Sequence, residues 1–226
     1  MDARDFYDKI AQSWYNIRHR TIFREELERM NGMWSGGKLL NIGCAHGPDF
    51  VSFDSKKFHF FGVDVSKNLL LMAKKYSQKF DLTFHLTLSD MKKLPFKDSS
   101  FDYIICIATL HHLLKREERL LALSEIKRVL KKEAFLAVWN RDNPELPNKE
   151  IIEREWHYRG EVFKRKYYLY TKEELEEELK RMGFEIKKIW TDGRDRNICA
   201  LICTTNSPVK FIRLLDKYKN GGQNEG

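Results

Sequence analysis

The sequence has little of what marks several large classes of protein. Its four cysteines, Cys44, Cys106, Cys199 and Cys203, form no C-x-x-C pair, which argues against a zinc site and against a disulfide scaffold. No apolar run approaches the roughly 18 residues of a membrane-spanning helix, and the first thirty residues are charged throughout. We therefore expect buried thiols, no metal, no membrane span, no signal peptide and a cytoplasmic location.

A dinucleotide-binding loop is also missing. Residues 39–50 read LLNIGCAHGPDF, a short apolar strand that runs into a G-x-x-x-G turn from Gly43 to Gly47. The G-x-G-x-x-G pattern that places a pyrophosphate at a helix N-terminus is absent, which disfavours NAD binding. The turn still suits a ligand site, because Gly43 can take backbone angles closed to other residues and Gly47 lets the chain come close to a ligand.

What is present describes an ordinary globular chain. The 226 residues are 42% hydrophobic and include 15 Phe, 9 Tyr and 5 Trp, enough for one domain with a full core. Lys and Arg number 41 against 33 Asp and Glu, for a formal charge of +8. That excess favours a polyanionic partner such as RNA, although a lysine- and glutamate-rich surface with no such role explains it equally well.

Short apolar runs alternate with amphipathic segments after a helical preamble. Residues 1–35 carry apolar side chains at helical spacing and end at the Asn31-Gly32 stop, and the domain proper spans 36–205. Within it we expect strands at 38–42, 59–64, 82–88, 102–107 and 134–140, and helices at 66–79 and 115–131. The alternation predicts an α/β fold with a doubly wound, mostly parallel sheet covered by helices on both faces.

The C-terminal third adds an insertion and two more strands. Residues 144–170 are rich in charge and aromatics with weak periodicity, and we interpret them as an insertion or lid. A capping box at residues 171–174 begins a helix. The runs 184–190 and 197–204 are joined by a short polar turn, which predicts antiparallel pairing. The C-terminal tail, 206–226, is expected to be disordered at its end.

Two carboxylates stand directly after predicted strands, where ligands bind in an open parallel sheet. Asp64 follows the second strand, about 20 residues after Gly43, the spacing at which a carboxylate accepts hydrogen bonds from ribose hydroxyls. Asp90 follows the third strand, where it could accept a hydrogen bond from the exocyclic amine of adenine. Each could equally be a helix cap or a turn residue. Together with the glycine turn, they describe a pocket for an adenosine-containing ligand that needs no phosphate.

Four segments resemble the successive motifs of class I S-adenosylmethionine-dependent methyltransferases. They are LLNIGCAHG, FFGVDVS, LSDMKKLPFKDSSFDYIICIATLHHL and EIKRVLKKEAFLAVW, in the usual order across residues 36–140. The resemblance implies a Rossmann-like methyltransferase fold with seven strands, of which one near the C-terminus is antiparallel, and S-adenosylmethionine as cofactor. It places Gly43 and Gly47 at the methionine part of the cofactor, Asp64 at its ribose, and the residues after Leu88 at its adenine. The residues predicted to contact the cofactor are Tyr7, Asn41, Gly43, Cys44, Ala45, Gly47, Asp64, Val65, Asp90, Met91, Ile107 and Ala108.

Three places depart from that family. Its members usually have Asp at position 41 and Gly at position 45, where this chain has Asn41 and Ala45. Asn41 can hydrogen-bond but supplies no negative charge, so we expect the positively charged cofactor to bind somewhat more weakly. Residues 131–134 also lack the usual Pro-Gly-Gly turn.

A narrower resemblance is to the methyltransferases that esterify the carboxymethyl group on the wobble uridine of tRNA. It rests on the segments YDKIAQSWYNIRHR, HHLLKREERLLALSEIKRVL and KRKYYLYTKEEL. It implies tRNA as a partner, and a small zinc-binding activator protein that covers an apolar edge of the methyltransferase. The segment 82–88 would be that edge strand. Its apolar face would consist of Leu82, Phe84, Leu86 and Leu88.

The catalytic candidates depend on the acceptor. Methyl transfer from a sulfonium is an in-line displacement in which alignment supplies much of the rate, and a carboxylate nucleophile needs no base. For a hydroxyl or amine acceptor, His111 or His112 is the candidate base, although we expect only one of them to face the pocket and a structural role explains the pair as well. The side chains that could hold an RNA backbone or an anionic acceptor, or could simply be solvated, are Arg18, Arg20, His157, Arg165 and Tyr167.

Three functions remain open. The net charge and the narrower resemblance favour an RNA methyltransferase that acts on a modified wobble uridine. A small-molecule methyltransferase would use residues 144–170 as the lid over its acceptor. A non-catalytic cofactor-binding protein would explain Asn41 and Ala45.

Overall fold

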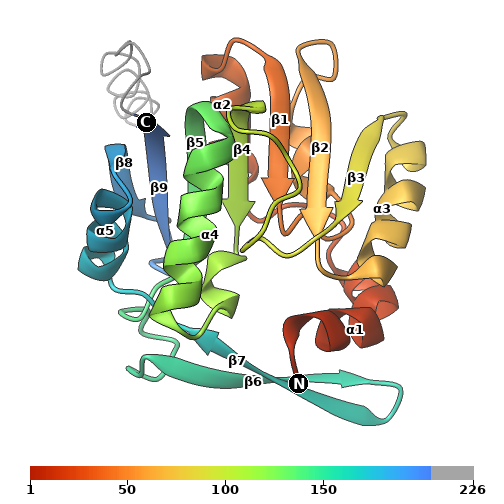
Figure 1. The fold of residues 1–226 in the computed structure, drawn as a ribbon. Helices are drawn as coiled ribbons and strands as arrows, with labels where there is room; N and C mark the ends of the chain where they lie inside the picture. The colour runs from red at the N-terminus through yellow and green to blue at the C-terminus, as the bar shows by residue number, and fades with distance from the viewer. Residues whose placement is uncertain (205–226) are drawn as a thin grey trace, which may run out of the picture.

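A seven-stranded sheet forms the centre of the computed structural model, which describes residues 1–204 and thus not the predicted tail (Figure 1). In sheet order the strands are β3 (Phe84–Leu88), β2 (Phe58–Asp64), β1 (Gly37–Ile42), β4 (Phe101–Ile107), β5 (Leu130–Trp139), β9 (Asn197–Thr204) and β8 (Phe184–Thr191). Strand β9 pairs antiparallel with both β5 and β8, and the other pairs are parallel. The predicted doubly wound sheet with one antiparallel strand is therefore confirmed.

The order of the strands reverses beside β1, which pairs with β2 on one side and β4 on the other. In such a sheet the loops after the two neighbouring strands lead to opposite faces and leave a crevice between them. The carboxyl ends of β1, β2 and β4 all point toward the same edge of the molecule (Figure 1). That edge is where the predicted ligand residues lie.

Helices cover both faces of the sheet. They are α1 (Ala3–Ile17), α2 (Arg24–Met33), α3 (Lys67–Lys79), α4 (Arg116–Val129) and α5 (Lys172–Arg181), with short 3-10 helices η1 (Pro48–Ser52) and η2 (Leu110–His112). One core cluster joins α4 and α5 to the sheet, and a second joins α2, η1 and part of α3 to its other face. Helix α1 packs on α3 near the carboxyl edge. None of the described helices is long and apolar enough to cross a membrane.

Local sequence signals place several element ends as predicted. The Ser66 hydroxyl caps α3 by accepting a hydrogen bond from the Leu69 amide. The predicted capping box begins α5, with both the Thr171 and the Glu174 side chains bonded to each other's backbone. Without a Pro-Gly-Gly turn, α4 passes directly into β5. Helix α4 ends at Val129 and β5 begins at the next residue, earlier than the strand start that we predicted at residue 134.

The segment that we interpreted as an insertion contains a β-hairpin rather than irregular chain. Strands β6 (Ile151–Tyr158) and β7 (Glu161–Tyr168) pair antiparallel as a separate two-stranded sheet. The hairpin crosses below the carboxyl ends of the central strands in Figure 1 and lies beside α1. The weak helical periodicity of this segment reflects strand alternation, in which residues of one face repeat every second position.

Candidate active site

A sharp turn after β1 begins the site. Gly43 has φ +72°, and a Cβ atom there would overlap the side chain of Thr109. Its amide and that of Cys44 both donate to the Val63 carbonyl, at 2.8 and 3.0 Å. Ala45 also has a positive φ, +47°, a conformation that costs a non-glycine residue about 1 kcal/mol. The chain therefore keeps the backbone path that a glycine at position 45 would favour.

Asp64 holds this turn in place from the end of β2. One carboxylate oxygen accepts from the Ala45 amide at 2.8 Å, and the other accepts from the Ser66 amide at 2.9 Å. Burial raises the pKa of the Asp64 carboxyl to about 6, against the effect of these two hydrogen bonds. Each oxygen retains a lone pair for a further donor, which is what a ribose diol offers.

The remaining cofactor candidates line one cavity with Asp64. The cavity has a volume of about 1030 Å³. The predicted cofactor residues on its wall are Tyr7, Gly43, Cys44, Ala45, Asp64, Val65, Asp90, Met91, Ile107 and Ala108. Burial raises the pKa of the Cys44 thiol well above its ordinary value, so Cys44 lies there as a neutral side chain.

Both histidines of η2 face the cavity, which corrects the expectation that only one would. Nδ1 of His111 accepts from the Trp139 amide at 3.1 Å, which leaves the proton on Nε2. Burial, reinforced by the charge of Arg165, lowers the pKa of His111 to about 3 and that of His112 well below its ordinary value. Both imidazoles are therefore neutral near pH 7, and neither readily takes up a proton.

The hairpin closes the cavity with a buried cation. Arg165 is 5% exposed, and its Nη1 has no hydrogen-bond partner. Its guanidinium lies 5.0 Å from the ring centre of Tyr7 and 5.8 Å from that of Tyr167. Within residues 1–204 no carboxylate lies within ion-pair distance of it. An isolated buried cation is costly unless an anion joins it, so this position favours an anionic ligand.

Other predicted substrate-holding residues divide into two groups. Arg18, Arg20 and Tyr167 line the cavity with Arg165. His157 does not, and its side chain is 72% exposed. It lies nearer the tip of the hairpin than the lining segment 153–156, so we correct the assignment of His157 to the site.

Two predicted cofactor residues also lie off the cavity wall. Gly47 has φ +86°, and a Cβ there would meet the Phe84 ring at 2.6 Å, so it serves the packing of the turn on β3. Asn41 is fully buried and donates to Asp49 at 3.0 Å. Asp49 itself lines the cavity. Our sequence reasoning missed Asp49, although an acidic residue directly after Gly47-Pro48, in a turn already assigned to a ligand, was a usable signal.

Parts of the chain are similar to known methyltransferases. Residues 40–138 match a family model described as "Methyltransferase domain". The tRNA (carboxymethyluridine(34)-5-O)-methyltransferase of Xenopus tropicalis is 30% identical over 145 residues, which are 63% of this chain and 22% of the frog protein. The demethylmenaquinone methyltransferase of Staphylococcus aureus is 28% identical over 170 residues, 74% of this chain and 62% of that protein. The chain thus spans only about a fifth of the tRNA-modifying relative.

Solved structures share the fold at low sequence identity. An S-adenosylmethionine-dependent methyltransferase from Clostridium acetobutylicum has a TM-score of 0.64 at 15% identity, covering 88% of this chain and 96% of that one. A complex between the Haloferax volcanii Trm112 methyltransferase activator and a methyltransferase gives 0.67 at 16% identity, covering 93% of this chain and 100% of that one. At these identities the likeness shows the fold.

The described residues fit S-adenosylmethionine. Asp64 offers free lone pairs beside the glycine turn, Asp90 and Met91 follow the next strand, and the turn comes close to the cavity without a phosphate-binding loop. Asp64 would hold the ribose and Met91 would pack on the adenine, while the cofactor would supply an electrophilic methyl group. Residues 40–138 match a methyltransferase domain, and the fold is shared with S-adenosylmethionine-dependent methyltransferases, which favours an enzyme over the non-catalytic alternative.

Proposed function

We propose that the enzyme methylates a carboxylate, the carboxymethyl group of a modified wobble uridine in tRNA, to give a methyl ester. The observation that carries the proposal is Arg165, a buried guanidinium without a carboxylate partner in the described chain, on the wall of the cofactor cavity. A guanidinium pairs with a carboxylate through two parallel hydrogen bonds and so fixes its orientation. The tRNA-modifying relative adds the substrate class.

The neutral histidines support the same acceptor. A hydroxyl or an amine must lose a proton during methyl transfer, and a base that resists protonation serves that step poorly. His111, with its pKa lowered to about 3, is such a poor base. A carboxylate is already ionised and attacks the methyl group with no proton transfer. The residues then act by orienting the acceptor and excluding water.

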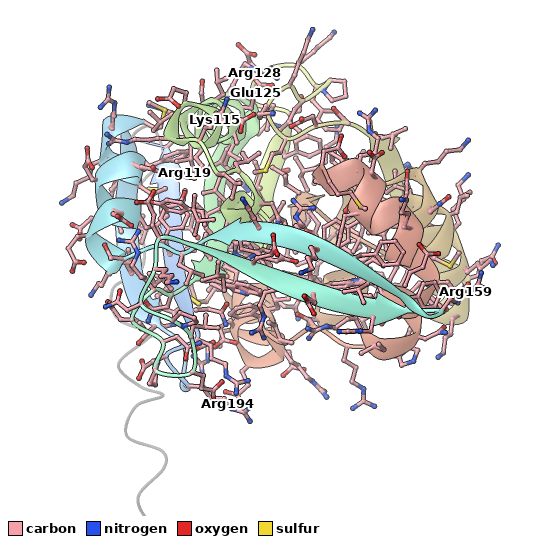
Figure 2. All side chains as sticks on the ribbon, turned by 90° about the horizontal axis from the view of Figure 1, so that it is seen from below. Lys115, Arg119, Glu125, Arg128, Arg159 and Arg194 are labelled. Carbon is pink, nitrogen blue, oxygen red and sulfur yellow. The ribbon has the colours of Figure 1, made fainter. Side chains whose placement is uncertain are left out.

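Basic side chains around the cavity suit a nucleic acid. Arg18, Arg20 and Arg154 line it and take part in no ion pair within residues 1–204. Lys164 also lines it but is paired with Glu155 at 2.8 Å. Lys115, just before α4, also lines the cavity, and Arg159 at the tip of the hairpin extends the basic surface beyond it (Figure 2). Phosphate contacts from such a rim would position tRNA, and a tRNA substrate fits the cytoplasmic location that we expect.

Edge strand β3 is our candidate surface for the small zinc-binding activator. It forms one edge of the sheet, and Leu88, on the apolar face that we expected a partner to cover, is 53% exposed. Phe84 and Leu86 pack partly against the core. The Haloferax methyltransferase solved with its activator shares this fold. Co-expression with and without a Trm112-type protein, followed by size-exclusion chromatography, tests the partner. A chain that stays monomeric and fully active alone would count against it.

A small-molecule methyltransferase is the second candidate, because the hairpin roofs the cavity with Trp156, Arg165 and Tyr167 and a quinone-methylating relative exists. The salt dependence of acceptor binding distinguishes a tRNA substrate from a small-molecule substrate. Binding of tRNA through several phosphates weakens steeply as salt rises, whereas binding of a small acceptor changes little. An Arg18→Gln/Arg154→Gln variant should reduce the slope of log affinity against log salt by about 2. A shallow slope in the unaltered protein would favour the small acceptor.

Nucleoside mass spectrometry tests the proposed reaction. The purified enzyme, with activator if required, is incubated with S-adenosylmethionine and tRNA that bears carboxymethyluridine. We expect a gain of one methyl group that mild alkali removes as methanol, since esters hydrolyse in base and N- or C-methyl groups do not. Unmodified tRNA serves as the control acceptor. A methyl group that survives alkali, or equal methylation of both tRNAs, would overturn the carboxylate proposal.

A further inference from the structure

The buried carboxylate of Asp49 lies beside Asn41, the position at which the related family usually has an aspartate. Asn41, at the end of β1, carries no charge, but its Nδ2 donates to the Asp49 carboxylate at 3.0 Å. If the amide were flipped, the Asn41 carbonyl oxygen would face the Asp49 carboxylate, and two acceptors cannot hydrogen-bond. The Asn41 amide nitrogen is therefore the donor to Asp49. The Asn41 Oδ1 atom is buried without a hydrogen-bond partner, and Asn41 does not line the cavity. Asn41 thus positions Asp49 instead of facing a ligand.

Asp49 itself meets the cavity from η1. It is 9% exposed and lies on the cavity wall near Gly43 and Pro48, in the turn that leads from β1. Thr21 also donates a hydrogen bond to it. Within residues 1–204 no lysine or arginine nitrogen lies within 4.0 Å of its carboxylate. A desolvated carboxylate with neutral donors and no cation is a site for a positively charged ligand group.

Opposite charge lies on the same wall. Arg20 precedes Thr21 in the segment between α1 and α2, lines the cavity and is exposed. Arg20 takes part in no ion pair within the described residues. A carboxylate and a guanidinium on adjoining parts of one wall match an amino acid, whose ammonium and carboxylate groups are separated by one carbon atom.

We propose that Asp49 binds the ammonium group of the methionine part of S-adenosylmethionine, with Arg20 facing its carboxylate, so that the negative charge missing at position 41 is supplied eight residues later by the turn. The assignment rests on the cofactor alone and is independent of the acceptor. It also removes the reason to expect weak binding from Asn41, because the charge is displaced along the chain and not lost.

Calorimetry with three cofactor analogues tests the assignment. S-adenosylhomocysteine carries both groups of the amino acid, decarboxylated S-adenosylmethionine keeps the ammonium, and methylthioadenosine has neither. Asp49→Asn should weaken the first two by about tenfold to a hundredfold, the range for a lost hydrogen bond to a charged group, and leave methylthioadenosine unchanged. Arg20→Gln should weaken only S-adenosylhomocysteine. Asp54→Asn, on the exposed loop before β2, is the matched control and should change none of them.

An exchange of the two side chains separates a binding role from a structural one. The variant Asn41→Asp/Asp49→Asn keeps the hydrogen-bonded pair and its net charge, and returns the charge to the position where the related family usually carries it. We expect it to bind S-adenosylhomocysteine more tightly than Asp49→Asn does, with methylthioadenosine binding equal in the two variants. Equal loss of methylthioadenosine binding in Asp49→Asn, or unaltered S-adenosylhomocysteine binding, would overturn the proposal. The calorimetry contains no tRNA, so its result is independent of whether the enzyme methylates tRNA.

Discussion

The hydroxyl of Tyr7 on α1 lies 3.1 Å from Nε2 of His112 on η2, although 105 residues separate them in the sequence. The same Tyr7 ring lies beside the Arg165 guanidinium of the hairpin. One contact therefore joins the N-terminal helix, the loop after β4 and the roof of the cavity. These three segments form the acceptor side of the site only because the chain folds them together.

Removal of this hydroxyl should cost stability. We expect Tyr7→Phe to lower the free energy of unfolding by about 1 kcal/mol, the usual contribution of one hydrogen bond, because His112 loses its partner at Nε2. Urea denaturation measures the change. Tyr15→Phe is the matched control, since the Tyr15 hydroxyl, also on α1, makes no hydrogen bond with the described residues. Equal losses in both variants would contradict a specific role for the Tyr7 contact.

Arg165 should affect the acceptor and not the cofactor. We expect Arg165→Met to lower kcat/KM for tRNA that bears carboxymethyluridine by about a hundredfold or more, since the loss of one partner of a buried charge pair costs about 2 to 5 kcal/mol. The Kd for S-adenosylhomocysteine should stay within twofold. Arg194→Gln, on the exposed turn between β8 and β9, is the control and should leave kcat/KM unchanged (Figure 2). A parallel loss of cofactor binding would show that Arg165 only supports the roof.

The buried pair of Arg119 and Glu178 should be the largest single stability determinant between α4 and α5. Arg119 is 3% exposed, donates to Glu178 at 2.8 Å and lies 3.7 Å from the ring centre of Tyr168. Arg119→Met should lower the free energy of unfolding by about 3 to 5 kcal/mol, because the buried Glu178 carboxylate loses its nearest cation and keeps only the Tyr170 hydroxyl and an Arg116 nitrogen at 3.8 Å. Adding Glu178→Gln should recover part of that loss.

A surface pair on the same two helices provides the comparison. Arg116 and Glu177 are 41% and 61% exposed, and Arg116→Gln should cost no more than about 1 kcal/mol. A chemical denaturation series on the three variants and the unaltered protein gives the values. Similar costs for Arg119→Met and Arg116→Gln would show that burial does not strengthen the inner pair.

Acid should destabilise the fold through its buried histidines. Burial lowers the pKa of His111 from 6.5 to about 3 and that of His46 to about 4, so the unfolded chain binds more protons below pH 6.5 and stability falls as the pH falls from there. Asp64 acts in the opposite direction, because its pKa is raised to about 6 and the folded state takes up its proton first.

The histidines should dominate that balance. At pH 5 each buried histidine costs about 2 kcal/mol relative to pH 7, while Asp64 returns about 1 kcal/mol. We expect the free energy of unfolding to be lower at pH 5 than at pH 7, and the difference to shrink in His46→Gln. His59→Gln, on an exposed position of β2, should leave the difference unchanged. A stability that rises toward pH 5 would contradict the neutral burial of these imidazoles.

Sequence periodicity determined most of the sheet. Alternating strands and helices predicted the doubly wound order, and the polar turn before Asn197 predicted the antiparallel pair, because both depend on local patterns and short connections. Asp64 and Asp90 were found because parallel strands end at one edge, so residues that follow strands meet without further information. The interpretation of residues 144–170 was incomplete, since a hairpin buried on one face against another element shows little pattern of its own.

Charge pairing across the site was decided by tertiary structure alone. The turn after β1 offered a signal for Asp49 as a ligand residue but none for its pairing with Asn41, and nothing in the local sequence separates the buried Arg165 from the exposed His157. His157 in β6 and Arg165 in β7 both belong to basic and aromatic strands. How the hairpin packs on α1 and η2 decides which of their side chains is buried at the cavity. The sequence by itself determined the elements and the edge where the cofactor binds. Only the packing of distant segments decided which charges are buried without a partner, because desolvation depends on neighbours that the chain brings together in three dimensions.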